Sequence, residues 1–400
     1  MKIGVAFGIS ELADPKDFEK KASKFLTQLA GEFEIKGGLM VSKRDESRRE
    51  ELDFRDVDVI LLYPLTGGTE NTLKGFSYFR KPVILYGDPS NNSLAAGIEL
   101  REYFRDRLIP STLVKSLDEL KAALLGYEDM KEMLEKFLNL RLGLIGRISP
   151  WLINEKFELP YIHISLKKFY EYYETTTEAE GWKAVEEIVM KAIDTKEPKR
   201  TDLAKAGRIY LTLKKIVEDY HLDGFTIGCF DLLQKLKATP CLALAIFNAQ
   251  GIPAACEGEL NSLLGMAIIK IFFNKPVFMG NIADYGENYI ILAHCTAPLT
   301  TGYVLRSHFE SGMGVGVEVK LPKGKASIIK IKGRKAVIAG VKIIEREKSE
   351  NRCRTQIRLR VEDAKDFIDG TLGNHHLLVY ADSEEIADLL SELGFEVMLY

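Results

Sequence analysis

Short apolar runs alternate with longer amphipathic stretches over the first 130 residues. The apolar runs are continuous enough to be strands buried on both faces, and they cover residues 1–7 (MKIGVAF), 57–68 (VDVILLYPLTGG) and 82–88 (PVILYGD). Helical patterns lie between or after them, at about residues 14–30, 74–80, 92–107 and 117–140. This alternation predicts a parallel sheet with helices on both faces.

The Gly-rich loop that ends the second of these runs, Thr66-Gly67-Gly68-Thr69-Glu70, is a candidate ligand contact. Ligands of parallel α/β sheets meet the loops at the carboxyl ends of the strands. A plain turn between a strand and a helix is the simpler interpretation of the same residues.

A second set of such units follows from about residue 140. Strands are expected at 140–148 (LRLGLIGRI) and 161–166 (YIHISL), helices at 179–192 and 202–220, and further alternating segments up to 276–282 (PVFMGNI). The pattern then changes to short strands separated by Gly, Pro, Lys and Asn, which is typical of an antiparallel domain or a partly closed barrel. A last helix near 383–393 and a closing strand at 395–400 complete the chain.

The sequence therefore predicts an α/β fold with three domains. Two N-terminal parallel-sheet domains, residues 1–138 and 139–289, precede a C-terminal antiparallel β-rich, barrel-like domain, residues 290–400.

Composition narrows the class of protein. A net charge of -3 and a pI near 6.2 argue against a nucleic-acid partner, which needs a basic surface. The longest apolar run, 263–273, is interrupted by Lys270 and is too short to span a bilayer, and the first residues do not resemble a signal peptide. Five cysteines without CxxC spacing suit reduced thiols. We expect a cytoplasmic protein without a membrane partner.

Glu257 is the first candidate for chemistry. It follows Ala-Ala-Cys, where a strand should end, and precedes a long apolar helical pattern. A charge in this position is desolvated unless a cation or a donor meets it. A carboxylate that stabilises the start of a helix is the alternative interpretation.

The six histidines provide the second set of candidates. His294 ends an apolar strand, His375 and His376 begin one, and His308 lies in a Gly-rich stretch with Glu310. Carboxylate and imidazole groups at the ends of separate strands are typical of a mononuclear site for Mn²⁺ or a similar ion. Buried histidines that bond to the backbone are the alternative. The GxSxG, GxxxxGK[ST] and GxGxxG motifs are absent where they would be needed.

Several segments together resemble a known family. CEGELNSLLGM, PVFMGNI, LAHCTAP, SHFESGMGVGV and GNHHLLVY are similar, in this order, to segments of the archaeal and bacterial L-fucose isomerase-like proteins, which are distant relatives of L-arabinose isomerase. The likeness extends to LIGRISPWLI, IGCFDLL, TGGTE and NSLAAGIELR, and so to nearly the whole chain.

This resemblance implies metal-dependent aldose–ketose isomerisation of a small-molecule sugar. In that chemistry a divalent metal, usually Mn²⁺, stabilises a cis-enediol while a carboxylate moves a proton between neighbouring carbons. The resemblance also implies two α/β domains, a β-rich domain, and a site where domains and neighbouring subunits of a trimer or hexamer meet.

The family's functional positions map onto named residues here. Glu257 matches the metal ligand and proton-transfer base, His375 the C-terminal ligand (His376 if the register differs by one), and His294 a histidine that coordinates the metal in some relatives. Asn281 stands where the family commonly has a catalytic acidic ligand. Trp151, His308, Glu310 and His376 are the predicted substrate contacts.

Asn281 is the one departure from the family pattern. Its amide offers a neutral oxygen to a metal, but it cannot carry a proton and it removes a negative charge. Glu259, Asp284 or Glu287 are candidates to compensate. A sugar-binding or regulatory relative that has lost catalysis is therefore the alternative function, and a metal-dependent lyase or epimerase using similar enediol chemistry is a third.

Overall fold

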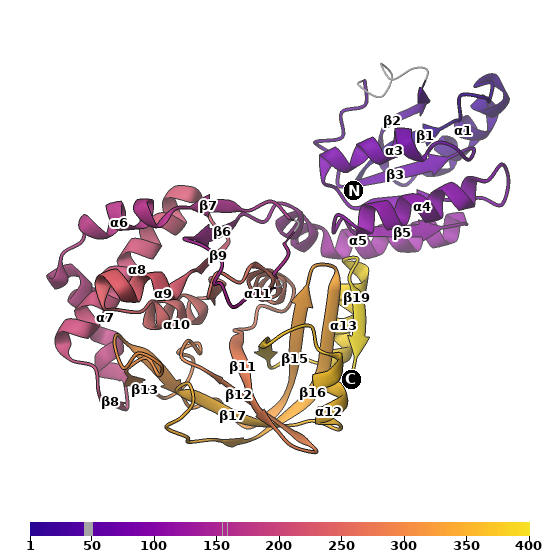
Figure 1. Ribbon diagram of the computed structural model, residues 1–400. Helices are drawn as coiled ribbons and strands as arrows, with labels where there is room; N and C mark the ends of the chain where they lie inside the picture. Colours follow the sequence, from indigo (N-terminus) through magenta and orange to yellow (C-terminus); the bar gives the residue numbers. More distant parts are fainter. Residues whose placement is uncertain (44–50, 154, 158) are drawn as a thin grey trace. The chain divides into compact units, whose positions relative to one another are not determined.

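The computed structural model describes residues 1–43, 51–153, 155–157 and 159–400. The chain divides into two compact units (Figure 1). The first contains residues 1–139 and 389–396, and the second contains residues 140–388 and 397–400. Each unit has its own sheets, and the three-domain division drawn from the sequence stays a prediction.

The first unit contains a five-stranded parallel sheet with the order β2-β1-β3-β4-β5. Its strands are β1 (Lys2–Gly8), β2 (Glu34–Val41), β3 (Val59–Pro64), β4 (Val83–Tyr86) and β5 (Ser111–Val114). The helical segments of this unit are α1 (Lys16–Leu29), α3 (Glu70–Leu73), the 3-10 helix η2 (Lys74–Phe79), α4 (Ser93–Arg105) and α5 (Leu117–Leu138). The strands β1, β3 and β4 are almost wholly buried, as their continuous apolar runs predict.

Strands β2 and β5 are the strands of this unit that the apolar pattern did not predict, and β2 has the more unusual backbone. Its sequence, EIKGGLMV, contains two glycines in the middle. The register with β1 shifts between Val5 and Ala6, so that Val5 faces Gly37 and Ala6 faces Leu39. The extra residue is accommodated because Gly37 and Gly38 both adopt positive φ values, of 91° and 89°.

The loop 66–70 joins the carboxyl ends of neighbouring strands. The Thr66 hydroxyl accepts a hydrogen bond from the backbone N–H of Ser10 after β1, and the Gly67 N–H donates to the carbonyl of Asn91 after β4. The loop therefore has a structural role, and a ligand at this edge stays a prediction.

The second unit begins with a four-stranded parallel sheet of order β10-β9-β6-β7. Its strands are β6 (Leu142–Ile145), β7 (Ile162–Ile164), β9 (Gly224–Ile227) and β10 (Ala254–Cys256). Its helices are α6 (Leu166–Glu174), α7 (Glu178–Lys191), α8 (Arg200–Tyr220), α9 (Cys229–Leu236), α10 (Cys241–Ala249) and α11 (Leu260–Phe273). A small sheet of order β14-β13-β8 adds β8 (Asp194–Thr195), β13 (Tyr303–Arg306) and β14 (Gly316–Val319).

A closed antiparallel barrel forms the rest of this unit (Figure 1). Six strands close it in the order β15-β18-β11-β12-β17-β16, because β15 and β16 also pair with each other. These strands are β11 (Phe278–Tyr285), β12 (Tyr289–His294), β15 (Gly324–Lys332), β16 (Lys335–Arg346), β17 (Thr355–Arg360) and β18 (His375–Val379). The short elements α12 (Ala364–Gly370), α13 (Ser383–Glu392) and β19 (Glu396–Leu399) complete the chain.

Helix α11 connects the parallel sheet to the barrel. It contacts β9 and β10 on one side and β15 and β18 on the other. At Gly265 the approach is so close that an added Cβ would lie 2.5 Å from a methyl carbon of Leu377. Nearly all of the helix is buried, and this explains its apolar sequence without a membrane. Across the described ranges, no helix has the length and apolarity that a bilayer crossing needs.

Candidate metal centre

Glu257 lies in the turn between β10 and α11. The turn is left-handed, with φ values of 63° at Glu257 and 74° at Gly258. A glycine is needed at 258 because an added Cβ would lie 2.5 Å from the carbonyl oxygen of Arg147. A glutamate with positive φ costs about 1 kcal/mol or more of local strain, and such strain is concentrated at functional sites. The backbone thus holds the Glu257 carboxylate in an unusual direction.

Two histidines from the barrel face this carboxylate. Nε2 of His375, at the start of β18, lies 3.4 Å from Oε1 of Glu257, and Nε2 of His294, at the end of β12, lies 3.8 Å from the same atom. One donor atom from each of the three residues lies within 4.8 Å of the others. Both imidazoles are almost fully buried, with side chains 2% and 6% exposed.

The other nitrogen of each imidazole faces a different polar group. Nδ1 of His294 lies 2.8 Å from the hydroxyl of Thr296, and Nδ1 of His375 lies 2.7 Å from Oε2 of Glu259, although without the alignment of a hydrogen bond. A carboxylate beside Nδ1 favours the tautomer that carries its proton there. Nε2 of neutral His375 then keeps its lone pair on the side of Glu257.

Glu259 is itself held by a buried cation. Its Oε1 accepts a hydrogen bond from Nζ of Lys330 on β15, and both side chains are at most 5% exposed. Burial alone would raise the pKa of Glu259, but His375 and Lys330 lower it to about 2. The pair therefore stays ionised and fixes the carboxylate that orients His375.

The centre carries a surplus of buried negative charge when His375 is neutral. Burial would raise the pKa of Glu257, but the imidazoles of His294 and His375 hold it well below its usual value. Burial would lower the pKa of His375, but Glu257 and Glu259 raise it to about 9. Two carboxylates and one lysine leave one negative charge, which a proton on His375 or a bound cation offsets.

These residues fit a divalent metal ion. Nε2 of His375 is buried and has no hydrogen-bond partner among the described residues, which is costly unless something binds it. One carboxylate and two imidazoles that converge are a donor set typical of Mn²⁺, Fe²⁺ or Zn²⁺. His375, rather than His376, is the histidine of this group.

An aromatic wall lies beside the centre. Nε1 of Trp151 donates a hydrogen bond to Oε2 of Glu257, and the Trp151 indole meets the Phe230 ring edge-on at 4.7 Å. The Phe230 ring in turn lies beside the imidazole of His308, with 5.8 Å between the ring centroids. Burial, followed by the neighbouring His294, lowers the pKa of His308 to about 4, so this imidazole is neutral at pH 7.

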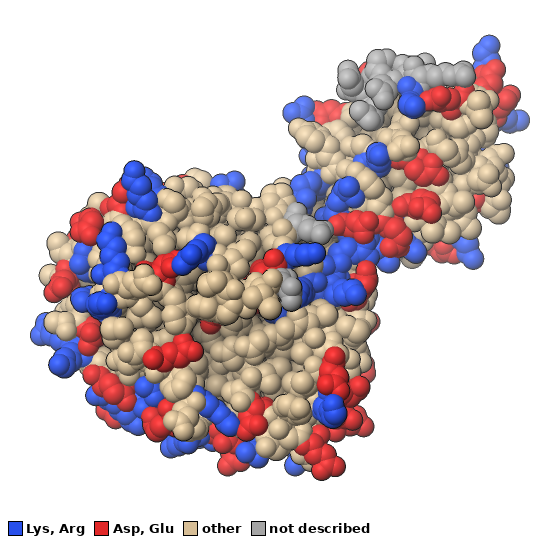
Figure 2. Space-filling view, viewed as in Figure 1, with Lys and Arg blue, Asp and Glu red and all other residues tan. Residues whose placement is uncertain are grey.

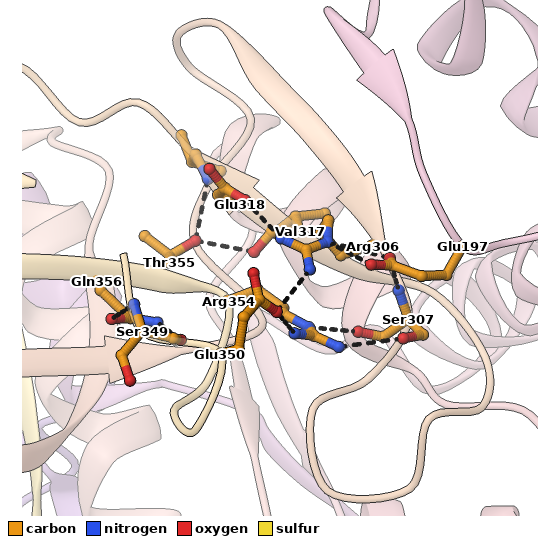
Figure 3. A network of polar contacts seen from close by, with 11 residues as sticks. Glu197, Arg306, Ser307, Val317, Glu318, Ser349, Glu350, Arg354, Thr355 and Gln356 are labelled. Atoms are coloured by element: carbon orange, nitrogen blue, oxygen red, sulfur yellow. Dashed lines mark hydrogen bonds and ion pairs between the residues drawn. The ribbon is translucent and has the colours of Figure 1, made fainter. Parts of the chain in front are cut away.

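A network of ion pairs holds the segment that carries His308 (Figure 3). Arg306 pairs with Glu197, Glu318 and Glu350, and the backbone N–H of Ser307 donates to Glu197. Arg354 donates to both the carbonyl and the hydroxyl of Ser307.

The same network reaches the strand that pairs with His294. Thr355 on β17 is the register partner of His294, and its hydroxyl donates to the carbonyl of Val317 and accepts from the N–H of Val319. The network thus supports two walls of the candidate site.

The other predicted site residues are not members of the Glu257, His294 and His375 group. Asn281 is the register neighbour of His375, but its amide oxygen accepts a hydrogen bond from Asn374 at 2.6 Å. Both nitrogens of His376 have protein partners, the hydroxyl of Thr371 and the carbonyl of Asn374. Glu310 is exposed as a whole residue, but neighbouring protein atoms desolvate its carboxyl group, and this effect, followed by the charge of Glu257, raises its pKa.

The sequence patterns did not identify three residues of the centre, or gave only weak signals for them: Glu259, Lys330 and Phe230. Glu259 was one of several candidates to compensate for Asn281, and the structure places it at His375, whereas Asp284 pairs with Arg352 at 2.7 Å. Lys330 lies in a predicted strand, and its position between two isoleucines was the only sequence signal that it is buried. Phe230 lies in IGCFDLL, one of the segments of the family resemblance, but no pattern singled it out within that segment.

Two curated relatives resemble the chain over most of its length. Both are named sulfoquinovose isomerase, from Priestia aryabhattai and Priestia megaterium, and each is 22% identical over 384 residues, covering 86% of this chain and 86% of the relative. No protein-family model matches the chain. This distant homology indicates that the chain is an enzyme of the sugar isomerase class, as the sequence predicts. It supports that broad class rather than the fucose isomerase-like branch.

Proposed function

We propose that this chain is a metal-dependent aldose–ketose isomerase whose metal is held by Glu257, His294 and His375. The observation that carries the proposal is the buried, unpartnered Nε2 of His375, which faces Oε1 of Glu257 at 3.4 Å. A metal bound there would act as a Lewis acid that stabilises the negative charge developing on the sugar oxygens. Mn²⁺ is the ion we expect first.

Glu257 is proposed as the base that moves the carbon-bound proton. It is ionised at neutral pH, its side chain is only 12% exposed, and its orientation is held by Trp151. The reaction takes a proton from the carbon next to the aldehyde and returns it to the aldehyde carbon, so that no proton is lost overall. The negative charge that appears in between resides on the two oxygens.

A second proton must pass between those two oxygens. Glu310 is proposed to carry it, because its raised pKa keeps a proton on the carboxyl group at higher pH than usual. The neutral imidazole of His308 and the rings of Trp151 and Phe230 are proposed to exclude water and to contact the carbon face of the sugar. A homo-oligomer, either trimer or hexamer, also remains part of this proposal.

The test measures aldose-to-ketose conversion over a panel of sugars with Mn²⁺ present. Sulfoquinovose, the sugar in the relatives' names, belongs in the panel with L-fucose and L-arabinose. We expect conversion of at least one sugar and a loss of about 10²–10⁴-fold in Glu257→Gln, the usual contribution of a general base. Conversion that is unaffected in the variant, or absent for every sugar, would contradict the proposal.

Reaction in D₂O separates isomerisation from epimerase or lyase chemistry. Isomerisation places the label at the two carbons that exchange the carbonyl group, and at no other carbon. Label at a distant carbon, or a product with a broken carbon–carbon bond, would support the other reactions.

A sugar-binding protein without turnover is the alternative, and Asn281 is the observation that favours it. Asn281 is adjacent to His375 in register and cannot carry a proton. This alternative predicts that sugars raise the melting temperature of the wild type without conversion, and that Asn281→Asp introduces turnover. If no sugar shifts the melting temperature, the alternative is wrong.

A further inference from the structure

The barrel has a second cavity at the end opposite the metal centre. β12 ends at His294 and β18 begins at His375, whereas the cavity is lined by Asn288, which precedes β12, and by residues 380–383, which follow β18. Its volume is about 1,000 Å³. Nothing in the proposed reaction uses this end of the barrel.

Three cations line this cavity in a single row. Lys325 on β15 faces Lys342 on β16, and Lys342 faces Arg360 on β17. Residues directly opposite on neighbouring strands have Cβ atoms about 5 Å apart, and like charges in such pairs destabilise a sheet. The row therefore costs stability when nothing neutralises it.

None of the three cations has a carboxylate oxygen within 4.0 Å among the residues described. The same sheet does neutralise a neighbouring cation. Arg358, two residues before Arg360 on β17, pairs with Glu347 at 2.6 Å. Arg358 thus has a carboxylate partner that the three cations of the row lack.

Two carboxylates also line the cavity, and one of them has another role. Asp382 Oδ1 accepts hydrogen bonds from the N–H groups of Glu384 and Glu385, so it caps the start of α13. Glu362 is exposed beside Arg360 in the chain and forms no ion pair with the row. The cavity lining therefore carries three positive and two negative charges, and one of the two carboxylates, Asp382, is already engaged by N–H groups of α13.

We infer that this end of the barrel binds a small anion with two or more negative charges, of the phosphate or sulfate type. Three adjacent cations on a rigid sheet match tetrahedral oxygens, and each charge-assisted hydrogen bond to such an oxygen is about twice as strong as a neutral one. The cavity is open to solvent and its three cations are exposed, so an anion can reach them, and its volume lies within the range of small-molecule sites. Three charges confined to one cavity, in a chain of net charge -3, fit a metabolite better than a nucleic acid.

Calorimetric titration with inorganic phosphate tests this inference on the full chain after removal of metal. Chloride at equal ionic strength is the reference, and sulfate is the second arm. Lys342→Gln removes the middle cation, and Lys335→Gln is the matched control, since Lys335 lies on the same strand, pairs with Lys332 and does not line the cavity. We expect phosphate and sulfate to bind the wild type and the control alike, and to bind Lys342→Gln about tenfold more weakly or worse.

A melting experiment provides the second readout. Without anion at low salt, Lys342→Gln should melt higher than the wild type because repulsion within the row is relieved, and saturating phosphate should reverse that order. A purely structural lysine would show no such reversal. Equal binding by all three proteins, no binding by the wild type, or equal weakening in the control would overturn the inference.

Discussion

Two charged clusters of the second unit differ in whether their buried polar atoms have partners. In the Arg306 cluster, Nε, Nη1 and Nη2 each meet a carboxylate, at 2.9, 3.0 and 3.0 Å (Figure 3). In the Glu257 centre, Nε2 of His375 has no hydrogen-bond partner among the described residues, and only one of the two carboxylates, that of Glu259, meets a lysine.

The difference separates a structural cluster from a functional one. A buried polar group that is fully paired stabilises the segments it joins, whereas an unpaired one costs free energy that only a ligand recovers. Exposed charged side chains cannot be sorted into structural and functional clusters in this way. On the view of Figure 2, Lys and Arg are intermixed with Asp and Glu around the edge of the larger unit, and such exposed pairs contribute little.

The largest expected effect comes from His375→Gln. We expect turnover to fall about 10³-fold, which corresponds to about 4 kcal/mol, and Mn²⁺ to lose its effect on the melting temperature. Calorimetry with Mn²⁺ and the conversion assay measure the two effects. If the variant still binds Mn²⁺ as the wild type does, His375 is not a ligand.

Arg306→Met should destabilise the fold by about 2–4 kcal/mol. The Arg306 side chain is 7% exposed, and its removal leaves Glu197 and Glu318 facing each other without a cation. Urea unfolding measures the loss, and Mn²⁺ affinity should change much less. A variant as stable as the wild type would show that the cluster is not structural.

The pH dependence of stability should differ between the wild type and Arg306→Met. Burial raises the pKa of Glu197, but the Ser307 N–H and Arg306 outweigh it, and the folded-state pKa lies below the usual value. Its contribution is therefore present above the unfolded pKa and is lost as pH falls through the folded pKa. Between about pH 5 and pH 3 the wild type should lose more stability than Arg306→Met. Parallel curves would contradict this assignment.

Glu350→Gln should have the smallest effect. Its side chain is 78% exposed although it pairs with both Arg306 and Arg354. Exposed ion pairs contribute about 0.5 kcal/mol or less, so urea unfolding and turnover should both stay near the wild-type values. A loss above 1 kcal/mol would mean that solvent screening at this pair is weaker than its exposure indicates.

Much of the fold could be predicted because apolar runs are local signals. The strands β1, β3 and β4 are continuous apolar segments, and the alternation with helices correctly indicates a parallel sheet. β2, β5 and β13 were not predicted. β5 and β13 are only four residues long, and β2 is interrupted by two glycines, so none of them forms a long continuous apolar run. The strand at 276–282 was predicted as the last segment of the second α/β set, whereas in the structure β11 pairs antiparallel with β12 and β18 in the barrel.

The sequence by itself determined which residue types could form the centre and on which segments they lie. Glu257 after a small-residue strand and histidines at strand ends are properties of neighbouring positions along the chain. Tertiary structure alone decided that Glu257, His294 and His375 converge, that Glu259 rather than Asp284 joins them, and that Lys330 neutralises it. Those contacts join residues up to 118 positions apart, and a distance of that kind is set by the closure of the barrel against α11, not by any local pattern.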